Sequence, residues 1–184
     1  MRSFIAIELD KKTIAVIKEI QKELKKSCNS LKLIKPKNIH ITLKFLGDIN
    51  EKQYLKIKSI LSSTAKEFSW FKLNISKIGC FPNYNSARIV WLGIENEKHL
   101  SSMAGEISSK INKTIDTKDN RPFKTHITIA RLKNKSKDIN KELFFKLTKI
   151  NCTMNVDKIA LIKSTLTTQG SIYEKLYEVN LKTI

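Results

Sequence analysis

The amino-acid sequence predicts an α+β fold with a mainly antiparallel sheet, arranged as two similar lobes. Segments with the apolar period of a helix alternate with strand-like segments, and short connections join them. No stretch rich in glycine, proline or serine divides the 184 residues, so we expect one bilobal domain over residues 1–184. A four-residue motif that begins at His40 recurs at His126, 86 positions later and close to half the chain. This spacing indicates an internal duplication.

The first part of the chain is predicted to fold as strand, helix, strand and helix. These elements cover residues 2–9, 10–26, 39–46 and 50–68. Asp10 is a typical N-cap residue for the first helix. Pro36 interrupts the chain ahead of the second strand, and Asn50 with Gln53 forms a capping box for the second helix. Each helix has apolar residues at helical spacing, which we expect to face the sheet.

The rest of the chain is predicted to mix strands and helices in the same way. We expect strands over residues 71–78, 87–94, 125–130, 156–166 and 172–181, and helices over residues 97–115 and 139–149. A polar loop leads through Pro122 into the strand that contains the second motif. Gln169 and Gly170 are typical turn residues and separate the last two strands.

The repeated motif reads His-Ile-Thr followed by an apolar residue, at positions 40–43 and 126–129. Alternate residues of a strand share a face, so His40 and Thr42 point to one side and the isoleucine between them points into the core. His126 and Thr128 are arranged alike. If the two strands face each other across a groove, two imidazoles and two hydroxyls converge on one place.

Such a set of side chains suits in-line displacement at phosphorus. One imidazole removes a proton from the attacking water, the other protonates the leaving oxygen, and the hydroxyls hold the non-bridging oxygens. Both charge states of histidine are populated near neutral pH, because its reference pKa is about 6.5. The sequence contains no P-loop, no dinucleotide-binding glycine pattern and no carboxylate cluster, which argues against metal-dependent nucleotide hydrolysis. We therefore expect His40 and His126 to be catalytic, with no metal and no cofactor.

A structural strand histidine is the alternative explanation for one copy of the motif. Threonine occupies 13 of the 184 positions, so chance places it two residues after a given histidine in roughly 7% of cases. Two such matches among only three histidines favour a functional explanation. The third histidine, His99, lacks the motif and lies in a polar stretch of a predicted helix, where we expect it at the surface.

The chain is strongly basic, with a formal net charge of +18. Such a field attracts polyphosphates at long range, so an anionic partner is expected. The alternative is a solvated, lysine-rich surface that only confers solubility. Lysines make up 31 of the 35 basic residues, whereas two of the four arginines, Arg121 and Arg131, flank the second motif. Arginine has the planar fork that binds phosphate through two parallel hydrogen bonds.

Cysteine content and hydropathy indicate where such a protein works. Cys28, Cys80 and Cys152 are odd in number and far apart, so we expect buried thiols rather than disulfides or a zinc site. No segment approaches the roughly 18 apolar residues of a membrane span. The first apolar stretch is too short for a signal peptide. We therefore expect a cytoplasmic monomer that does not insert into a membrane.

Together with their surroundings, these residues resemble the 2H phosphoesterase superfamily. Within it, the chain is similar to the RNA 2′,3′-cyclic phosphodiesterases, also called the 2′-5′ RNA ligase family. The resemblance covers nearly the whole chain and rests on residues 2–7, 38–48, 81–82, 87–93, 121–131, 164–166 and 170–173. Thr125 is a small departure, since the family often has proline at this position.

The resemblance implies a bilobal fold in which two mainly antiparallel sheets line a central basic cleft, with helices packed outside. It also implies metal-independent hydrolysis of RNA ends that carry a 2′,3′-cyclic phosphate, giving a 2′-phosphate. By analogy with the family, His126 activates water and His40 protonates the leaving 3′ oxygen. Thr42 and Thr128 would bind the phosphate and Arg131 would add positive charge. Strict alternation places Arg131 on the opposite face from His126, so that role requires the strand to bend.

Several further residues have two interpretations each. Lys44 shares the face of His40 by alternation, and either contacts the RNA backbone or is a solvated lysine at a strand end. Phe4 and Phe123 either stack on a base or, as we expect, pack in the core. Arg2 and Arg121 are candidates for the anion-binding cleft.

Two other functions remain open from the sequence. The same histidines would support 2′-5′ RNA ligation, with a 5′-hydroxyl in place of water. Water needs no positioning of a second RNA end, so we expect hydrolysis as the net reaction. The chain could also be a non-catalytic RNA-binding protein, but phosphate binding alone requires no histidines and lysine would serve it better.

Overall fold

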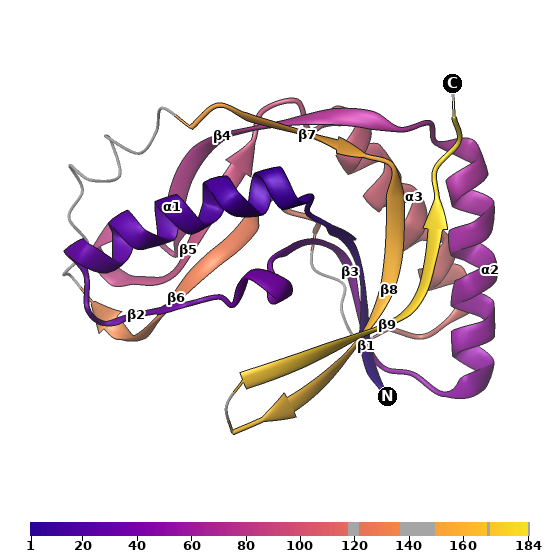
Figure 1. Ribbon diagram of the computed structural model, residues 1–184. Coiled ribbons are helices and arrows are strands. Elements are labelled where there is room, and N and C mark those ends of the chain that lie inside the picture. Colours follow the sequence, from indigo (N-terminus) through magenta and orange to yellow (C-terminus); the bar gives the residue numbers. More distant parts are fainter. Residues whose placement is uncertain (118–121, 137–149, 169, 184) are drawn as a thin grey trace.

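The computed structural model describes residues 1–117, 122–136, 150–168 and 170–183. Its strands are β1 (Arg2–Glu8), β2 (Leu31–Leu33), β3 (His40–Asp48), β4 (Phe71–Phe81), β5 (Ala87–Ile94), β6 (Ile127–Ser136), β7 (Cys152–Val156), β8 (Lys158–Thr167) and β9 (Gly170–Asn180). Its helices are α1 (Lys11–Ser27), α2 (Glu51–Glu67) and α3 (Lys98–Thr114), with short 3-10 helices η1 (Pro36–Asn38) and η2 (Tyr84–Ser86). This mixture of helices and antiparallel strands confirms the predicted α+β class (Figure 1).

The described strands form one continuous, curled sheet (Figure 1). Their order is β7-β4-β5-β6-β3-β1-β8-β9, and β2 pairs with β6. The two predicted sheets are the two halves of this one, and they meet where β3 pairs with β6. Within the described strands this junction is a single antiparallel pair, Ile41 with Ile127, and both side chains are fully buried.

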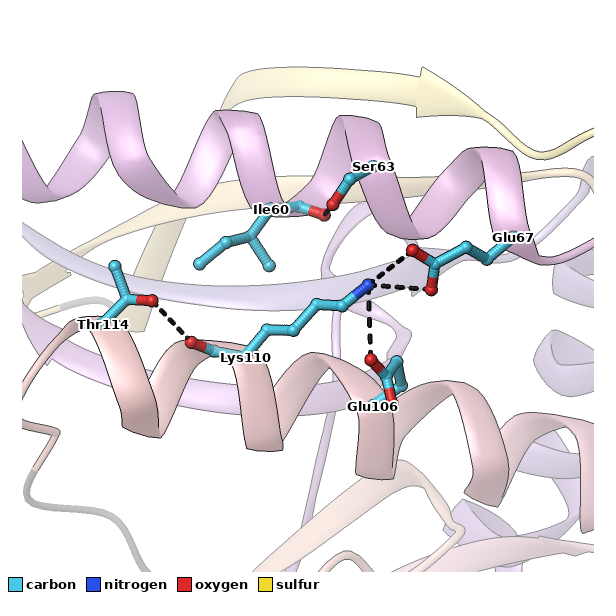
Figure 2. A network of polar contacts seen from close by, with 6 residues as sticks. All are labelled: Ile60, Ser63, Glu67, Glu106, Lys110 and Thr114. Carbon is cyan, nitrogen blue, oxygen red and sulfur yellow. Dashed lines mark hydrogen bonds and ion pairs between the residues drawn. The ribbon is translucent and has the colours of Figure 1, made fainter.

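Each half of the sheet has its own helical cover (Figure 1). Helix α1 packs against β2, β6 and β7, whereas α2 and α3 pack on each other and against β3, β8 and β9. Figure 2 shows how α2 and α3 are tied together: Lys110 of α3 donates to both carboxylate oxygens of Glu67, at 2.8 Å, and lies 3.3 Å from Glu106. The arrangement agrees with the bilobal prediction.

Two predicted helix starts are confirmed by their caps. The carboxylate of Asp10 accepts a hydrogen bond from the Thr13 amide at 2.6 Å. Asn50 and Gln53 exchange reciprocal side-chain to backbone hydrogen bonds of 2.9 Å each, which completes the capping box. Both caps satisfy amide groups that a helix leaves unpaired at its first turn.

Two strands were not predicted, and one predicted helix lies outside the described residues. Strand β2 has only three residues, too few for a pattern to develop. Strand β7 does alternate between buried and exposed residues, which is the signal that could have found it. The helix predicted over residues 139–149 lies in a part of the chain that the structure does not describe.

The core lies between the helices and the sheet, and a second small cluster lies on the other face of β1. The main cluster includes Ile5 and Ile7 of β1, whereas the second consists of Phe4, Ala6, Ala160 and Ile162, with Tyr173 packed against it. Strand β1 is therefore buried on both faces, which explains its nearly continuous apolar sequence.

The three cysteines are free and buried, as predicted. In the described ranges, every helix is too short or too polar to pass through a lipid bilayer.

Candidate active site

The two His-Ile-Thr motifs lie side by side at the junction of the two half-sheets. Because Ile41 pairs with Ile127 in antiparallel register, His40 lies beside Thr128 and Thr42 beside His126. Both isoleucines point into the core, so the four polar side chains lie on the opposite face of the sheet. The structure thus brings together residues that are 86 positions apart in the sequence.

Each histidine ring is held by a backbone carbonyl two residues earlier. Nδ1 of His40 lies 2.8 Å from the carbonyl oxygen of Asn38, and Nδ1 of His126 lies 2.6 Å from that of Lys124. A carbonyl oxygen only accepts, so each Nδ1 must carry the hydrogen and donate it. In the neutral rings the lone pair is then on Nε2. This atom is the one available for proton transfer in both residues.

Thr42 and Asn38 complete the immediate contacts of His40. Nε2 of His40 lies 3.0 Å from the hydroxyl oxygen of Thr42. The Asn38 side chain donates a 2.8 Å hydrogen bond to the carbonyl oxygen of Ser171 in β9, which holds η1 against that strand. The carbonyl that orients His40 is therefore itself fixed by a contact with the other end of the chain.

The environment of His40 strongly favours its neutral form. Burial lowers the pKa of His40 to about 4, and the charges of His126 and Arg131 act in the same direction. The Asn38 carbonyl and the carboxylate of Glu8 act in the opposite direction, but burial is the largest effect. The influence of His126 on His40 also means that the two rings belong to one electrostatic site.

Aromatic side chains surround both histidines. The ring centroid of Phe4 lies 4.8 Å from that of His40, and Tyr173 meets the same imidazole edge-on at 5.4 Å. Phe81 meets His126 edge-on at 5.6 Å. Sequence reasoning assigned no role to Tyr173 or Phe81, because they come from β9 and β4 and no local pattern links them to the motifs.

A β-bulge in β6 places Arg131 on the same face as the motif. Ile89 of β5 pairs with Arg131 and Trp91 pairs with Thr128, so the partner strand advances two residues while β6 advances three. Opposed residues share a face, so Thr128 and Arg131 point to the same side. Arg131 could act at the site only if its strand departed from strict alternation, and this bulge is that departure. Its charge also reaches His40, whose pKa it helps to lower.

A second bulge, in β3, moves Lys44 away from the site. Ala6 pairs with Thr42 but Ile5 pairs with Lys44, so Leu43 is the extra residue. Lys44 is consequently on the core face with Ile5 and only 7% exposed. The prediction that it shares the face of His40, like its interpretation as a solvated lysine, was wrong because strict alternation fails at the bulge.

The remaining predicted residues add no polar group to the site. Phe4 is buried at 3% exposure and Phe123 packs on the main core, which confirms the core interpretation of both. Arg2 begins β1 opposite Asp48, about 20 Å along the strand from the end that pairs with His40. His99 is exposed, as predicted. Arg121 lies outside the described residues.

The described residues also contain no set of three histidine, cysteine, aspartate or glutamate side chains placed to bind a metal ion. The site combines two imidazoles whose Nε2 atoms carry the lone pair, two threonine hydroxyls and an arginine on one face. This set has acids, bases and donors for an anion, as general acid–base chemistry at a phosphate requires.

Known proteins match this chain in sequence over nearly its whole length. The model of the family described as LigT like Phosphoesterase matches residues 7–91 and again 92–173, and each match holds one copy of the motif. A protein of Archaeoglobus fulgidus named RNA 2′,3′-cyclic phosphodiesterase is 34% identical over 96% of this chain and 98% of its own. One of Methanocaldococcus jannaschii with the same name is 34% identical over 97% and 99%.

Solved structures show the same fold. A crystal structure from Thermus thermophilus superposes with a TM-score of 0.88 at 24% identity, and covers 100% of this chain and 99% of that one. The LigT protein of E. coli, solved as a complex with 3′-AMP, gives a TM-score of 0.75 at 24% identity over 99% and 98%.

Proposed function

The chain belongs to the LigT-like phosphoesterase family, and from this membership we propose that it is an RNA 2′,3′-cyclic phosphodiesterase. It would open the cyclic phosphate at an RNA end to a 2′-phosphate. The observation that carries the proposal is the pairing of Ile41 with Ile127, since this contact brings two histidines and two threonines to one face. The relatives named for this activity match over nearly the full chain, which supports the same assignment.

The proposed reaction uses one histidine for each proton. Nε2 of His126 takes a proton from water, whose oxygen attacks phosphorus. The bond between phosphorus and the 3′ oxygen breaks in line, and Nε2 of His40 donates a proton to that oxygen. The phosphate remains on the 2′ oxygen. The Thr42 and Thr128 hydroxyls donate to the non-bridging oxygens while Arg131 offsets their negative charge.

Because the pKa of His40 is low in the free protein, the substrate itself must raise it before His40 can act as the acid. In the free protein, burial keeps His40 neutral above about pH 4. The anionic cyclic phosphate raises the pKa of an adjacent imidazole, because it stabilises the charged ring. Binding of the substrate would therefore prepare His40 to act as the acid. The reaction itself needs no metal ion in this scheme.

The direct test is the product formed from a 2′,3′-cyclic nucleotide or a cyclic-phosphate RNA in the presence of EDTA. We expect a 2′-phosphate, identified by chromatography against both phosphate isomers, and full activity after chelation. Exclusive formation of a 3′-phosphate, or loss of turnover in EDTA, would show the mechanism to be wrong. Adding an RNA with a 5′-hydroxyl tests ligation in the same experiment, and a joined product in excess of the 2′-phosphate would reverse the expected direction.

A further inference from the structure

A basic groove of about 600 Å³ lies between α1 and the segment that leads into β3. One wall is a stripe of α1 with residues at helical spacing: Lys11, Ile14, Ala15 and Lys18. The facing wall is formed by Pro36, Lys37 and Ile39, and the groove ends at Glu8 and Leu9. Lysines therefore stand on both sides of a floor that is partly apolar.

One end of this groove, at Glu8, lies next to the strand position of His40. Glu8 is the residue of β1 that pairs with His40 across the strands, and Ile39 precedes His40 in the chain. The carboxylate of Glu8 is also close enough to raise the pKa of His40 against the effect of burial. A polymer whose end is bound at His40 can therefore enter the groove at the end formed by Glu8.

The charge in the groove is available to an anion. Lys11, Lys18 and Lys37 are exposed, and among the residues that the structure describes none of them forms an ion pair. The one carboxylate in the lining, Glu8, is paired with Lys175 at 2.6 Å. The groove therefore keeps three uncompensated positive charges. The phosphates of a phosphodiester chain bind to lysines arranged in this way, independently of the base sequence.

We propose that this groove binds the RNA strand on the 5′ side of the terminal nucleotide, so that the preferred substrate is an oligonucleotide rather than a free cyclic nucleotide. The proposal rests on the proposed function, because the RNA end is placed at His40. Lys11 and Lys18 are seven residues apart on α1, about 10 Å along the helix axis. The lysines consequently reach more than one phosphate.

The test compares two substrates and two triple variants. One variant removes the groove lysines (K11A, K18A and K37A). The matched control removes three exposed lysines of α2 (K52A, K56A and K66A), and so lowers the net charge by the same amount. Circular dichroism confirms that both are folded. The kcat/KM of each is measured with 2′,3′-cyclic AMP and with a short RNA that ends in a 2′,3′-cyclic phosphate.

We expect the groove variant to lose about 3- to 100-fold in kcat/KM on the RNA, the range for three exposed ion pairs, with little change on cyclic AMP. The control should remain near wild type on both. The slope of log kcat/KM against log salt on the RNA should become shallower by up to about 2 in the groove variant, because three phosphate contacts are lost.

Two outcomes would overturn the proposal. Equal losses in both triple variants would assign the effect to the general field of the protein. Equal kcat/KM of the wild type on cyclic AMP and RNA would show that the strand makes no use of the groove.

The proposed function can fail separately. If the wild type turned over neither substrate, the groove would still be tested by fluorescence anisotropy with an uncleavable RNA oligonucleotide. Weaker binding by the groove variant than by the α2 control supports the groove. Equal binding, or competition by polyglutamate as strong as by unlabelled RNA, contradicts it.

Discussion

His40 and His126 hold their rings in the same way but in different surroundings. Both donate Nδ1–H to the carbonyl two residues earlier, which leaves Nε2 for chemistry. His40 is additionally packed against both Phe4 and Tyr173, and its burial lowers its pKa to about 4. The proposed roles of acid and base therefore depend on local environment rather than on the motif, which is identical in the two places.

Replacing each histidine in turn should separate the two roles. Turnover of H40A and H126A should fall by about 10²–10⁴, the usual contribution of general acid–base groups. In H126A the residual rate should fall as pH rises, because His40 must be protonated. In H40A it should rise with pH, because His126 must be neutral. The measurement is kcat against pH with saturating cyclic nucleotide.

The exposed His99 provides the control for both variants, and H99A should match the wild type at every pH. Opposite pH trends in H40A and H126A would exchange the roles of the two residues. Full turnover in both would remove them from the mechanism.

The depressed pKa of His40 also predicts how stability depends on pH. Between about pH 4 and 6.5 the unfolded chain binds a proton at this residue that the folded chain does not, so the free energy of unfolding rises with pH. The contribution is complete above the unfolded pKa and is lost as pH falls through about 4. It amounts to roughly 3 kcal/mol at most.

Urea unfolding of the wild type and H40A across this pH range measures the effect as a difference. The stability of the wild type relative to H40A should increase with pH. Parallel curves for wild type and H40A would contradict a His40 that is neutral in the folded protein.

Strand irregularities decide which side chains reach the site. The bulge in β6 turns Arg131 to the face of Thr128, and the bulge in β3 turns Lys44 to the core. Neighbouring strands support the site in a similar way. Trp91 of β5 stacks on Phe81 of β4 at 5.1 Å, and Phe81 in turn meets His126. Gly79 of β4 pairs with Trp91 and leaves room for its indole.

Two glycine-to-alanine substitutions should have opposite effects. A Cβ atom at Gly79 would overlap the indole of Trp91, whose Cε2 atom would be 2.8 Å away. We expect G79A to lower the free energy of unfolding by about 1–3 kcal/mol and, because Trp91 supports Phe81, to lower kcat as well. At Gly105, in the exposed middle of α3, no atom lies within 4 Å of such a Cβ. G105A should raise stability by up to about 1 kcal/mol with kcat unchanged.

Thermal unfolding and kcat of both variants test this pair. A G79A protein as stable as the wild type would show that the Trp91 indole can move aside without lowering the free energy of unfolding. A G105A protein with reduced kcat would show that α3 affects the site.

The two half-sheets share one core, which bears on how the molecule unfolds. The main cluster contains Ile5 and Ile41 from one half as well as Leu92 and Ile127 from the other. We propose on this ground that residues 1–184 act as one domain, although only one described residue pair joins β3 to β6. Shared burial, rather than hydrogen bonding, would then hold the halves together.

Unfolding should accordingly be a single cooperative transition. Trp70 and Trp91 lie in or next to the half-sheet built on β4 and β5, so tryptophan fluorescence follows that half. The far-ultraviolet circular dichroism signal also reports the helical content of α2 and α3, which belong to the other half. Urea curves from the two probes should coincide. Separate midpoints would show that the halves unfold independently.

Local patterns in the sequence were sufficient to predict most elements and the histidines and threonines of the candidate site. Apolar period, the caps at Asp10 and Asn50, and the duplicated His-Ile-Thr motif depend on neighbours in the chain, and they located three helices, most strands and the histidine pair. These signals are physically local, since a helix face or a strand face is defined within a few residues.

Only the tertiary structure decided what depends on contacts between distant segments. Strand register fixed the pairing of Ile41 with Ile127, and bulges, which no local period reveals, moved Arg131 toward the site and Lys44 away from it. Burial by residues from β1 and β9 set the low pKa of His40, because desolvation depends on everything packed around a group rather than on its neighbours in the chain.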